Sequence, residues 1–299
     1  MNMYTDKRTD FYKDRYENRA RLMIKCPDQP GIVSAISTFL WNQQANIVTS
    51  NQYTQDPKGG EFFMRLDFEY QTGTDVEKLK QEFQEIADRF QMDWRLSLVH
   101  ELKNIAIFVS KESHCLLELL WEWQSGDLMA NIPVVISNHE NSRKMVEALG
   151  IDFYHLPVTK ETKPEIEAKQ KEILEDYDID LIVLARYMQI LSPTFVEVFK
   201  DRIINIHHSF LPAFIGAKPY ERAFERGVKM IGATSHYVTN DLDEGPIIEQ
   251  GTEPVSHEHN VEDLKKIGQS IERRVLAQAV KWHLEDRIIV HGNKTIVFE

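Results

Sequence analysis

Between Ala20 and Val99 the hydrophobic residues switch repeatedly between a strand-like and a helix-like period. Alternating or β-branched apolar positions predict strands, and apolar residues three and four apart predict amphipathic helices. The predicted strands are residues 20–26, 45–55, 61–71 and 92–99, and the predicted helices are residues 32–43 and 75–90. Their order, βαββαβ, is that of a ferredoxin-like module.

The pattern changes after a short polar link at residues 100–104. Short, nearly continuous apolar runs follow, separated by helical segments, and such runs are typical of parallel strands buried on both faces. The runs are residues 105–110, 132–138, 153–158, 181–186 and 203–208, and the helices are predicted at 113–124, 141–150, 163–177 and 192–200. This alternation predicts an α/β fold with a doubly wound, mostly parallel sheet.

The last part of the chain departs from this alternation. Residues 230–240 and 245–256 predict two longer strands, for which antiparallel pairing is considered, and residues 261–285 predict a long amphipathic helix. The end of the chain predicts a hairpin around Gly292-Asn293. We therefore expect a first domain at 19–99, a linker at 100–104 and a second domain at 105–299. Residues 1–18 are expected to form an N-terminal arm, which is either loose or a short extension packed on the rest of the chain.

Composition and charge narrow the class of protein. The chain has 299 residues, of which 42% are hydrophobic and 27% are charged, as in a globular protein. Its formal net charge of -12 disfavours nucleic-acid binding, and no run is long enough to cross a membrane. Two cysteines without metal or redox spacing, together with a polar start that lacks a signal-peptide core, predict a cytoplasmic location.

Candidate chemistry is concentrated after two of the late strands. Asn205 and His207 are two residues apart on a predicted strand, so their side chains share a face near its carboxyl end, where α/β sheets bind ligands. A second cluster contains His236 and Asp243 before a Gly-Pro break. A carboxylate beside an imidazole and an amide can perform acid–base work on an acyl carbon.

Simpler interpretations of the same residues stay open at this point. His207 could be a core histidine with a satisfied hydrogen bond, and Asp243 could cap a turn. A metal site is a third option, but the spacings of the histidines match no standard zinc pattern. These histidines are His207, His208, His236, His257 and His259. We expect no metal.

The segment NIHHSFLP followed by HYVTNDLDEGPIIEQ resembles the active-site signature of the formyltetrahydrofolate-dependent formyltransferase superfamily. Within that superfamily, residues 103–284 are most similar to the formyltetrahydrofolate deformylases. The resemblance implies that Asn205 and His207 hold the formyl oxygen, that Asp243 activates water, and that His236 supports Asp243. It also implies a folate pocket lined by Met188, Gln189, Ile190, Leu191, Thr239, Asn240 and Asp241. 10-Formyltetrahydrofolate would be the substrate, with no cofactor.

The N-terminal module resembles an ACT domain, as carried by these deformylases. This resemblance implies a regulatory role, with subunits paired in a homo-oligomer, a dimer or tetramer, and an amino-acid effector bound at a turn. The implied contacts are Asp28, Gln29, Pro30, Gly31 and Ile32, because glycine there lets backbone approach a ligand. The alternative is a purely structural dimerisation module.

The loop after the first strand of the α/β domain bears on the reaction type. A transferase that uses a phosphoribosyl amine needs a phosphate cradle, commonly a glycine-rich loop at a helix N-terminus. Here the loop is Ser110 to His114, which contains no glycine and carries Glu112. This absence favours water as the acceptor, with Lys111 and His114 closing the former acceptor pocket. The alternatives are a formyltransferase to an unidentified amine, or a folate sensor without turnover.

Overall fold

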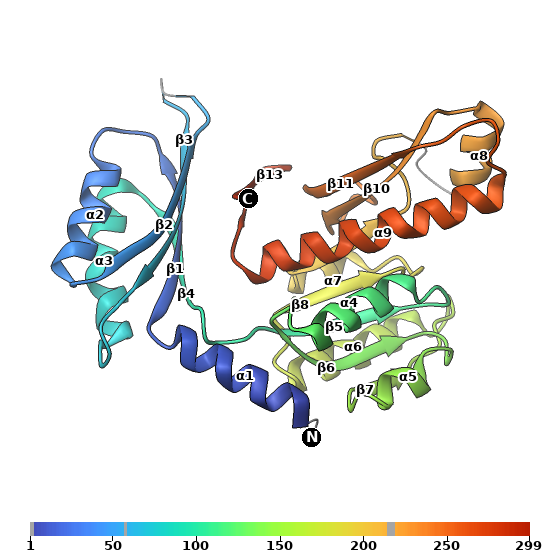
Figure 1. Ribbon diagram of the computed structural model, residues 1–299, viewed down its shortest axis with the longest axis horizontal. Coiled ribbons are helices and arrows are strands. Elements are labelled where there is room, and N and C mark those ends of the chain that lie inside the picture. Colours follow the sequence, from blue (N-terminus) through green and yellow to red (C-terminus); the bar gives the residue numbers. More distant parts are fainter. Residues whose placement is uncertain (1–2, 57–58, 214–218) are drawn as a thin grey trace. The chain divides into compact units, whose positions relative to one another are not determined.

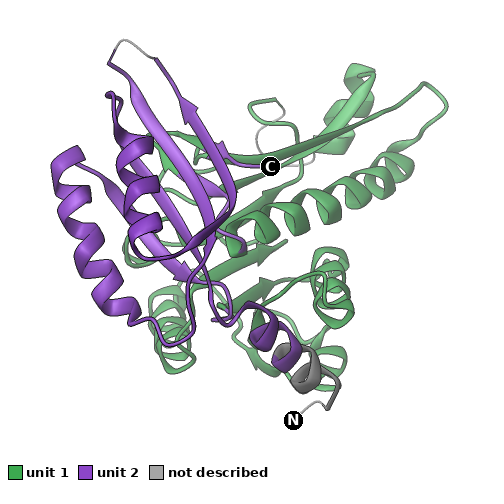
Figure 2. Cartoon of the chain, turned by 60° about the vertical axis from the view of Figure 1, so that its left-hand side comes forward, with its two compact units in different colours: residues 1–3, 103–284, 290–295 green, residues 4–102, 285–289, 296–299 purple. Residues whose placement is uncertain are grey.

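The computed structural model describes residues 3–56, 59–213 and 219–299, with side chains described from Asp10 onward. The chain divides into two compact units, coloured separately in Figure 2. One unit contains residues 4–102, 285–289 and 296–299, and is called the N-terminal unit. The other contains residues 103–284 and 290–295, and is called the α/β unit. No helix in the described ranges is long and apolar enough to span a membrane.

The N-terminal unit has the predicted βαββαβ order, preceded by a helix. Its sheet has the strand order β2-β3-β1-β4, and neighbouring strands are antiparallel. The elements are α1 (Met3–Tyr16), β1 (Arg19–Pro27), α2 (Ile32–Asn42), β2 (Asn46–Thr54), β3 (Glu61–Glu69), α3 (Val76–Phe90) and β4 (Asp93–Leu98). The segment predicted as an arm is therefore mostly helical.

The core of the N-terminal unit lies between α2, α3 and one face of the sheet. Ile36 and Phe39 of α2 and Phe83 of α3 are buried against alternate residues of β1 and β3. Asp75 caps α3, because its carboxylate accepts a hydrogen bond from Lys78 N at 3.1 Å. Amphipathic helices and alternating strands thus bury one common apolar layer, as the periodicity predicted.

The opposite face of this sheet is covered by the end of the chain. Met23 and Phe63 contact Phe298, and the Arg65 guanidinium donates hydrogen bonds to the carbonyl oxygens of Asp286 at 2.9 Å and Glu285 at 3.0 Å. The sequence prediction assigned all of 105–299 to the second domain. The structure differs, because residues 285–289 and 296–299 pack on the N-terminal sheet.

Asp286 is the acidic residue at the centre of this packing. It is 2% exposed, and its carboxylate lies 3.7 Å from Arg21 Nη1 and 3.5 Å from Arg95 Nη2. Its φ of 51° is left-handed, a conformation that asparagine also tolerates. Removing one partner of a buried ion pair leaves the other charge uncompensated in a poorly solvated place.

We expect Asp286→Asn to lower the free energy of unfolding by about 3 kcal/mol, since it deletes the charge and keeps the shape. Urea unfolding monitored by circular dichroism measures this. Asp201→Asn is the matched control, because Asp201 also has a left-handed φ of 57° but is exposed. We expect the control to stay within about 0.5 kcal/mol of the unsubstituted chain. Equal stability of both variants would show that the buried ion pairs contribute nothing net.

The α/β unit is built on a seven-stranded sheet with the order β11-β10-β9-β8-β5-β6-β7. The strands β9, β8, β5, β6 and β7 are parallel, and β10 runs antiparallel to both neighbours. Their bounds are β5 (Asn104–Val109), β6 (Asn131–Ser137), β7 (Asp152–His155), β8 (Leu181–Ala185), β9 (Ile203–His207), β10 (Met230–Tyr237) and β11 (Ile247–Pro254). The predicted fold class is confirmed, and so is the antiparallel pairing of the two late strands.

Helices cover both faces of this sheet (Figure 1). Apolar residues of α6 and α7 pack on one face, while α4 and α9 pack on each other, with α9 along β9 to β11. The helices are α4 (His114–Ser125), α5 (Arg143–Glu147), α6 (Lys163–Asp176), α7 (Pro193–Val198), α8 (Pro219–Arg226) and α9 (Val261–Leu284). The short helix α8 was not predicted. The chain ends in the predicted hairpin, β12 (Ile288–His291) and β13 (Lys294–Val297), with Gly292 at a φ of 58°.

Candidate active site

Strand β9 presents Asn205 and His207 on one face at its carboxyl end, as the two-residue spacing predicted. β10 pairs antiparallel with β9, so that His236 lies directly opposite Asn205 and Thr234 opposite His207. Asn205 Nδ2 and His236 Nε2 are 3.2 Å apart. The register of the two strands thus brings together an amide and an imidazole that are 31 residues apart in sequence.

The loop after β10 carries Asp243 back toward these side chains. Asp243 has a left-handed φ of 59°, which aspartate tolerates better than most residues. The turn also requires Gly245, because a Cβ there would lie 1.8 Å from the carbonyl oxygen of Tyr237. Tyr237 N in turn donates to the carbonyl oxygen of Pro246 at 2.9 Å. A tight backbone approach therefore fixes the position of Asp243.

Asp243 is held between two histidines, His207 and His236. Its Oδ2 is 3.1 Å from His207 Nδ1, and its Oδ1 is 3.7 Å from His236 Nε2. His236 Nδ1 lies 2.9 Å from the carbonyl oxygen of Tyr237, which can only accept, so the proton is assigned to Nδ1. Nε2 of His236 can then accept from Asn205. His207 Nε2 is buried and has no hydrogen-bond partner among the described residues.

The ionisation of Asp243 is governed by its two histidine partners. Burial raises the pKa of its carboxyl group, but the hydrogen bond from His207, the nearby His236 ring and the positive charge of these rings when protonated lower it by more. The net pKa lies well below the usual range for aspartate. Burial alone would raise this pKa and make Asp243 a stronger base, but here the histidine partners outweigh desolvation.

We expect the Asp243 carboxyl group to stay ionised from about pH 5 to pH 8. A buried carboxyl group without cationic partners would titrate in this range, because burial raises its pKa. Because the folded-state pKa is depressed, its contribution to stability is present above the unfolded-state value of about 3.9 and is lost as pH falls further. Carbon-13 NMR of labelled aspartate, with the Asp243 signal assigned through Asp243→Asn, measures this. A carboxyl shift that titrates near neutral pH would contradict the ion-pair geometry.

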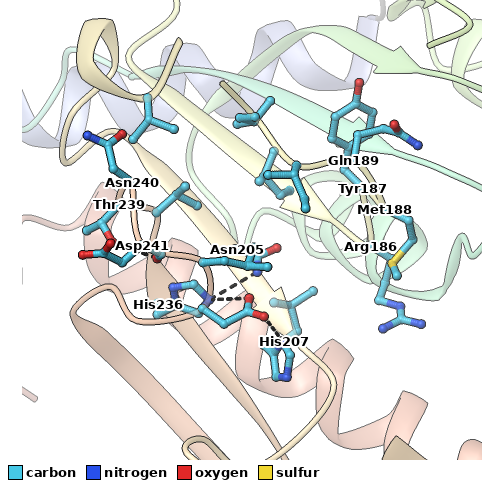
Figure 3. Close-up of a pocket in the computed structure, with 18 of the residues that line it drawn as sticks. Arg186, Tyr187, Met188, Gln189, Asn205, His207, His236, Thr239, Asn240 and Asp241 are labelled. Atoms are coloured by element: carbon cyan, nitrogen blue, oxygen red, sulfur yellow. Dashed lines mark hydrogen bonds and ion pairs between the residues drawn. The ribbon is translucent and has the colours of Figure 1, made fainter. Parts of the chain in front are cut away.

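A cavity of about 450 Å³ opens beside these groups. All the predicted catalytic and folate-pocket residues line it: Met188, Gln189, Ile190, Leu191, Asn205, His207, His236, Thr239, Asn240, Asp241 and Asp243. The apolar side chains of Met188, Ile190 and Leu242 are more than half exposed there, at 57%, 63% and 59%. In Figure 3 the segment at Gln189 and the loop at Asn240 lie on opposite sides of Asn205. This arrangement can hold a flat ligand between two loops.

Several residues that were not predicted from the sequence also line the cavity. Arg186, Tyr187 and His208 are the polar ones, and Leu184, Val196, Ile206 and Val238 are the apolar ones. Burial lowers the pKa of His208 to about 4, with the charge of Arg186 as the next cause, so this histidine is neutral near pH 7. Arg186 directly follows β8, and its place at a carboxyl strand end was the signal that could have identified it.

The predicted effector turn lies between β1 and α2 of the N-terminal unit. Gly31 has a φ of 97°, which permits the sharp entry into α2, and Asp28 N donates to the carbonyl oxygen of Gly60 at 2.8 Å. Gln29, Pro30 and Gly31 are exposed, whereas Ile32 is 2% exposed and belongs to the core. Pro30 precedes the helix rather than forming its first turn, since α2 begins at Ile32.

One group of side chains in the described part of the α/β unit has donor types that could bind a metal: His114, Cys115 and Glu272. The carboxylate of Glu272 already accepts from Tyr220 Oη at 2.7 Å and lies 2.8 Å from His114 Nε2. Arg186 Nε is 3.4 Å away. A guanidinium cation at that position neutralises the carboxylate, so this set is poorly suited to a divalent cation.

Two domain families match the chain. Residues 20–86 match the ACT domain, and residues 103–280 match the formyl transferase domain. The fold and site therefore define an enzyme that joins an ACT domain to a formyl transferase-type α/β domain.

Relatives specify the family further. The chain is 62% identical over 300 residues to the formyltetrahydrofolate deformylase of Bacillus subtilis, covering 100% of both chains. The structure of a formyltetrahydrofolate deformylase from Pseudomonas syringae superposes with a TM-score of 0.91 at 43% identity, covering 98% of this chain and 100% of that one. Glycinamide ribonucleotide transformylase 1 from Symbiobacterium toebii is more distant, with a TM-score of 0.63 and 32% identity, covering 66% of this chain and 95% of that one. The chain belongs to the formyltetrahydrofolate deformylase family.

Proposed function

We propose that this enzyme hydrolyses 10-formyltetrahydrofolate to tetrahydrofolate and formate, without a cofactor. The observation that carries the proposal is the convergence of Asn205, His207 and Asp243 on one cavity in a chain of this family. The cavity supplies an amide donor, an imidazole and an ionised carboxylate, which together suit attack of water on a formyl carbon.

The formyl oxygen lies against Asn205 and His207 in the proposed complex. Only one amide hydrogen of Asn205 is directed to His236, and the other is free to donate to the substrate. His207 lines the cavity and its Nε2 has no hydrogen-bond partner among the described residues, so this atom can donate to the substrate when the ring is protonated. Asp243 at 3.1 Å stabilises that imidazolium. Preorganised donors of this kind contribute about 3–4 kcal/mol each to the transition state.

Asp243 orients the attacking water and accepts its proton within the Asp243–His207 pair. The water oxygen bonds to the formyl carbon as one water proton passes to the Asp243–His207 pair, the C–N10 bond then breaks, and the pair returns that proton to the departing N10. Because the pKa of Asp243 is lowered, its main contribution is to orient the water and to hold the charge of His207. General acid–base participation of this kind adds roughly 10²–10⁴-fold to the rate. His236 acts through Asp243 and Asn205 as a supporting group.

The folate ring occupies the space between the segment 188–191 and the loop 239–242. The exposed apolar side chains of Met188, Ile190 and Leu242 form its walls. Met188 N donates to Ser110 Oγ at 3.1 Å, and Ser110 Oγ donates to Asn138 Oδ1 at 2.7 Å, which positions the start of the first segment. Apolar walls with few convergent polar groups are typical of a cofactor-sized ligand site.

The test is release of formate from 10-formyltetrahydrofolate by the purified chain with no amine present. Equal amounts of formate and tetrahydrofolate are the expected result. Turnover that starts only when an amine is added would favour the formyltransferase alternative, and binding of the folate without any turnover would favour the sensor alternative.

The ACT domain supplies a second, regulatory site in this proposal. The turn at Asp28 to Gly31, in which Gln29, Pro30 and Gly31 are exposed, binds a small amino acid in a homo-oligomer in which ACT domains pair. Calorimetric titration of the whole chain with glycine and with methionine tests this, and absence of heat from both would leave a structural dimerisation module. The cytoplasmic location expected from the unpaired cysteines stays a prediction.

A further inference from the structure

A second cluster of polar side chains lies beside the catalytic residues, centred on Glu272 of α9. Glu272 is 1% exposed, yet its pKa is lowered, because the bonds from His114 and Tyr220 and the charge of Arg186 outweigh burial. Its carboxylate accepts from Tyr220 Oη at 2.7 Å and lies 2.8 Å from His114 Nε2 and 3.4 Å from Arg186 Nε. We call these four residues the Glu272 cluster. A buried carboxylate is stable only when it is paired and hydrogen-bonded, and the fold supplies Glu272 with three such partners.

The cluster stands where an open α/β sheet normally has its ligand crevice. In this sheet the strand order reverses between β5 and β8, and ligands bind outside the carboxyl ends of such strands. His114 is the first residue of the helix that follows β5, and Arg186 directly follows β8. Both side chains reach Glu272 from opposite sides of the switch point. The crevice between the two strands is therefore occupied by the chain's own side chains.

Two backbone features maintain this arrangement. Arg186 has a left-handed φ of 62°, a conformation that is unfavourable for a residue other than glycine. Gly268 allows Tyr220 to lie against α9, because a Cβ at position 268 would be 1.9 Å from Tyr220 Oη. An unfavourable backbone conformation at Arg186 and a close approach at Gly268 indicate that the side chains of Arg186 and Tyr220 are needed beside Glu272.

The cluster adjoins the catalytic groups through His208 and Arg186, which both line the catalytic cavity. The His208 ring centroid is 5.2 Å from that of His207 and 6.2 Å from that of Tyr220. In Figure 3 the Arg186 guanidinium and the His207 ring lie toward the same end of the view, away from Gln189 and Asn240. Arg186 Nε and Nη1 are buried without a hydrogen-bond partner in the described residues.

We propose that the Glu272 cluster determines the acceptor of the formyl group, by filling the half of the crevice in which an amine-bearing second substrate would lie. Folate occupies the side lined by segments 188–191 and 239–242, so a nucleophile must approach from the side of Arg186 and His208. With that side filled, water is the nucleophile that fits. This inference rests on the proposed hydrolysis and adds the residues that restrict it.

Arg186→Gly tests the proposal, because glycine accepts the left-handed backbone and removes the side chain that faces the cavity. The variant is incubated with 10-formyltetrahydrofolate and glycinamide at mildly alkaline pH, and both formate and N-formylglycinamide are measured. In transfer, the amine nitrogen bonds to the formyl carbon, its proton passes to the Asp243–His207 pair, and N10 leaves with a proton. We expect the ratio of transfer to hydrolysis to rise by about tenfold or more over the unsubstituted chain.

Arg186→Lys is the matched control, since it retains a long cationic side chain, and its ratio should remain that of the unsubstituted chain. His114→Ser, which shortens the side chain on the other side of the switch point, provides a second opening if Arg186→Gly does not fold. Folded variants that turn over 10-formyltetrahydrofolate with an unchanged ratio would overturn the proposal. Failure of the proposed hydrolysis is distinguishable, because the unsubstituted chain itself would then release no formate without an amine.

Discussion

Replacement of Asp243 by asparagine is expected to lower kcat/KM for formate release by about 10³-fold or more, the largest single effect predicted for this enzyme. Asparagine keeps the size and tolerates the φ of 59°, but it removes the charge that lies 3.1 Å from His207 Nδ1. In the proposed mechanism, the protonated His207 ring then loses its carboxylate partner, and the attacking water loses its acceptor. Steady-state assay of formate release measures the loss.

Glu244→Gln is the matched control for this variant. Glu244 is the next residue, is exposed, and loses the same unit of charge. We expect its kcat/KM to stay within about twofold of the unsubstituted chain, because an exposed charge in water acts weakly on its neighbours. Comparable losses in the two variants would assign the effect to the net charge of the loop, and full activity of Asp243→Asn would remove Asp243 from the mechanism.

Gly245→Ala is expected to reduce kcat/KM by about 10²-fold while the chain still folds, because a displacement of about 1 Å in a catalytic group costs that much. The added Cβ would lie 1.8 Å from the carbonyl oxygen of Tyr237 and 3.3 Å from His236 Nδ1. These are the two atoms of the bond that assigns the His236 proton. The turn must shift, and it carries Asp243 with it.

Gly150→Ala separates the cost in stability from the displacement of the site. Gly150 has a φ of 76° with open space around its Cβ position, and it does not line the catalytic cavity. We expect Gly150→Ala to lower the free energy of unfolding by about 1 kcal/mol and to leave kcat/KM unchanged. Full activity in Gly245→Ala, measured in the same assay, would show that the close approach does not position Asp243.

The parts of the site that were predictable are those set by local periodicity. Asn205 and His207 share a face because strand side chains alternate, and strand ends mark the ligand side of an α/β sheet. The approach of Asp243 depends instead on the pairing register of β9 with β10 and on a left-handed turn, which no short-range pattern encodes. The direction of its pKa shift followed from that geometry, and the sequence therefore could not supply it.

Glu272 shows a different limit of sequence analysis. In an amphipathic helix, an isolated glutamate is indistinguishable from a solvent-facing residue, and its partner His114 is 158 residues away. The same holds for Asp286, whose partners lie on β1 and β4 at the other end of the chain. The burial of such charged residues cannot be predicted from the residues beside them in sequence, because those residues resemble the neighbours of exposed positions. It depends on tertiary contacts with distant parts of the chain.

The discontinuity of the N-terminal unit affects how this protein can be divided or recombined. A fragment that ends at Leu102 would lack residues 285–289 and 296–299. Arg65 would then lose its two carbonyl acceptors, and Met23 and Phe63 would be exposed to solvent. Deleting the residues after Leu284 would do the same damage from the other end of the chain. An exchange of ACT domains between relatives therefore has to transfer two separated pieces of sequence. A simple fusion at the linker would leave the face of the sheet that carries Met23, Phe63 and Arg65 uncovered.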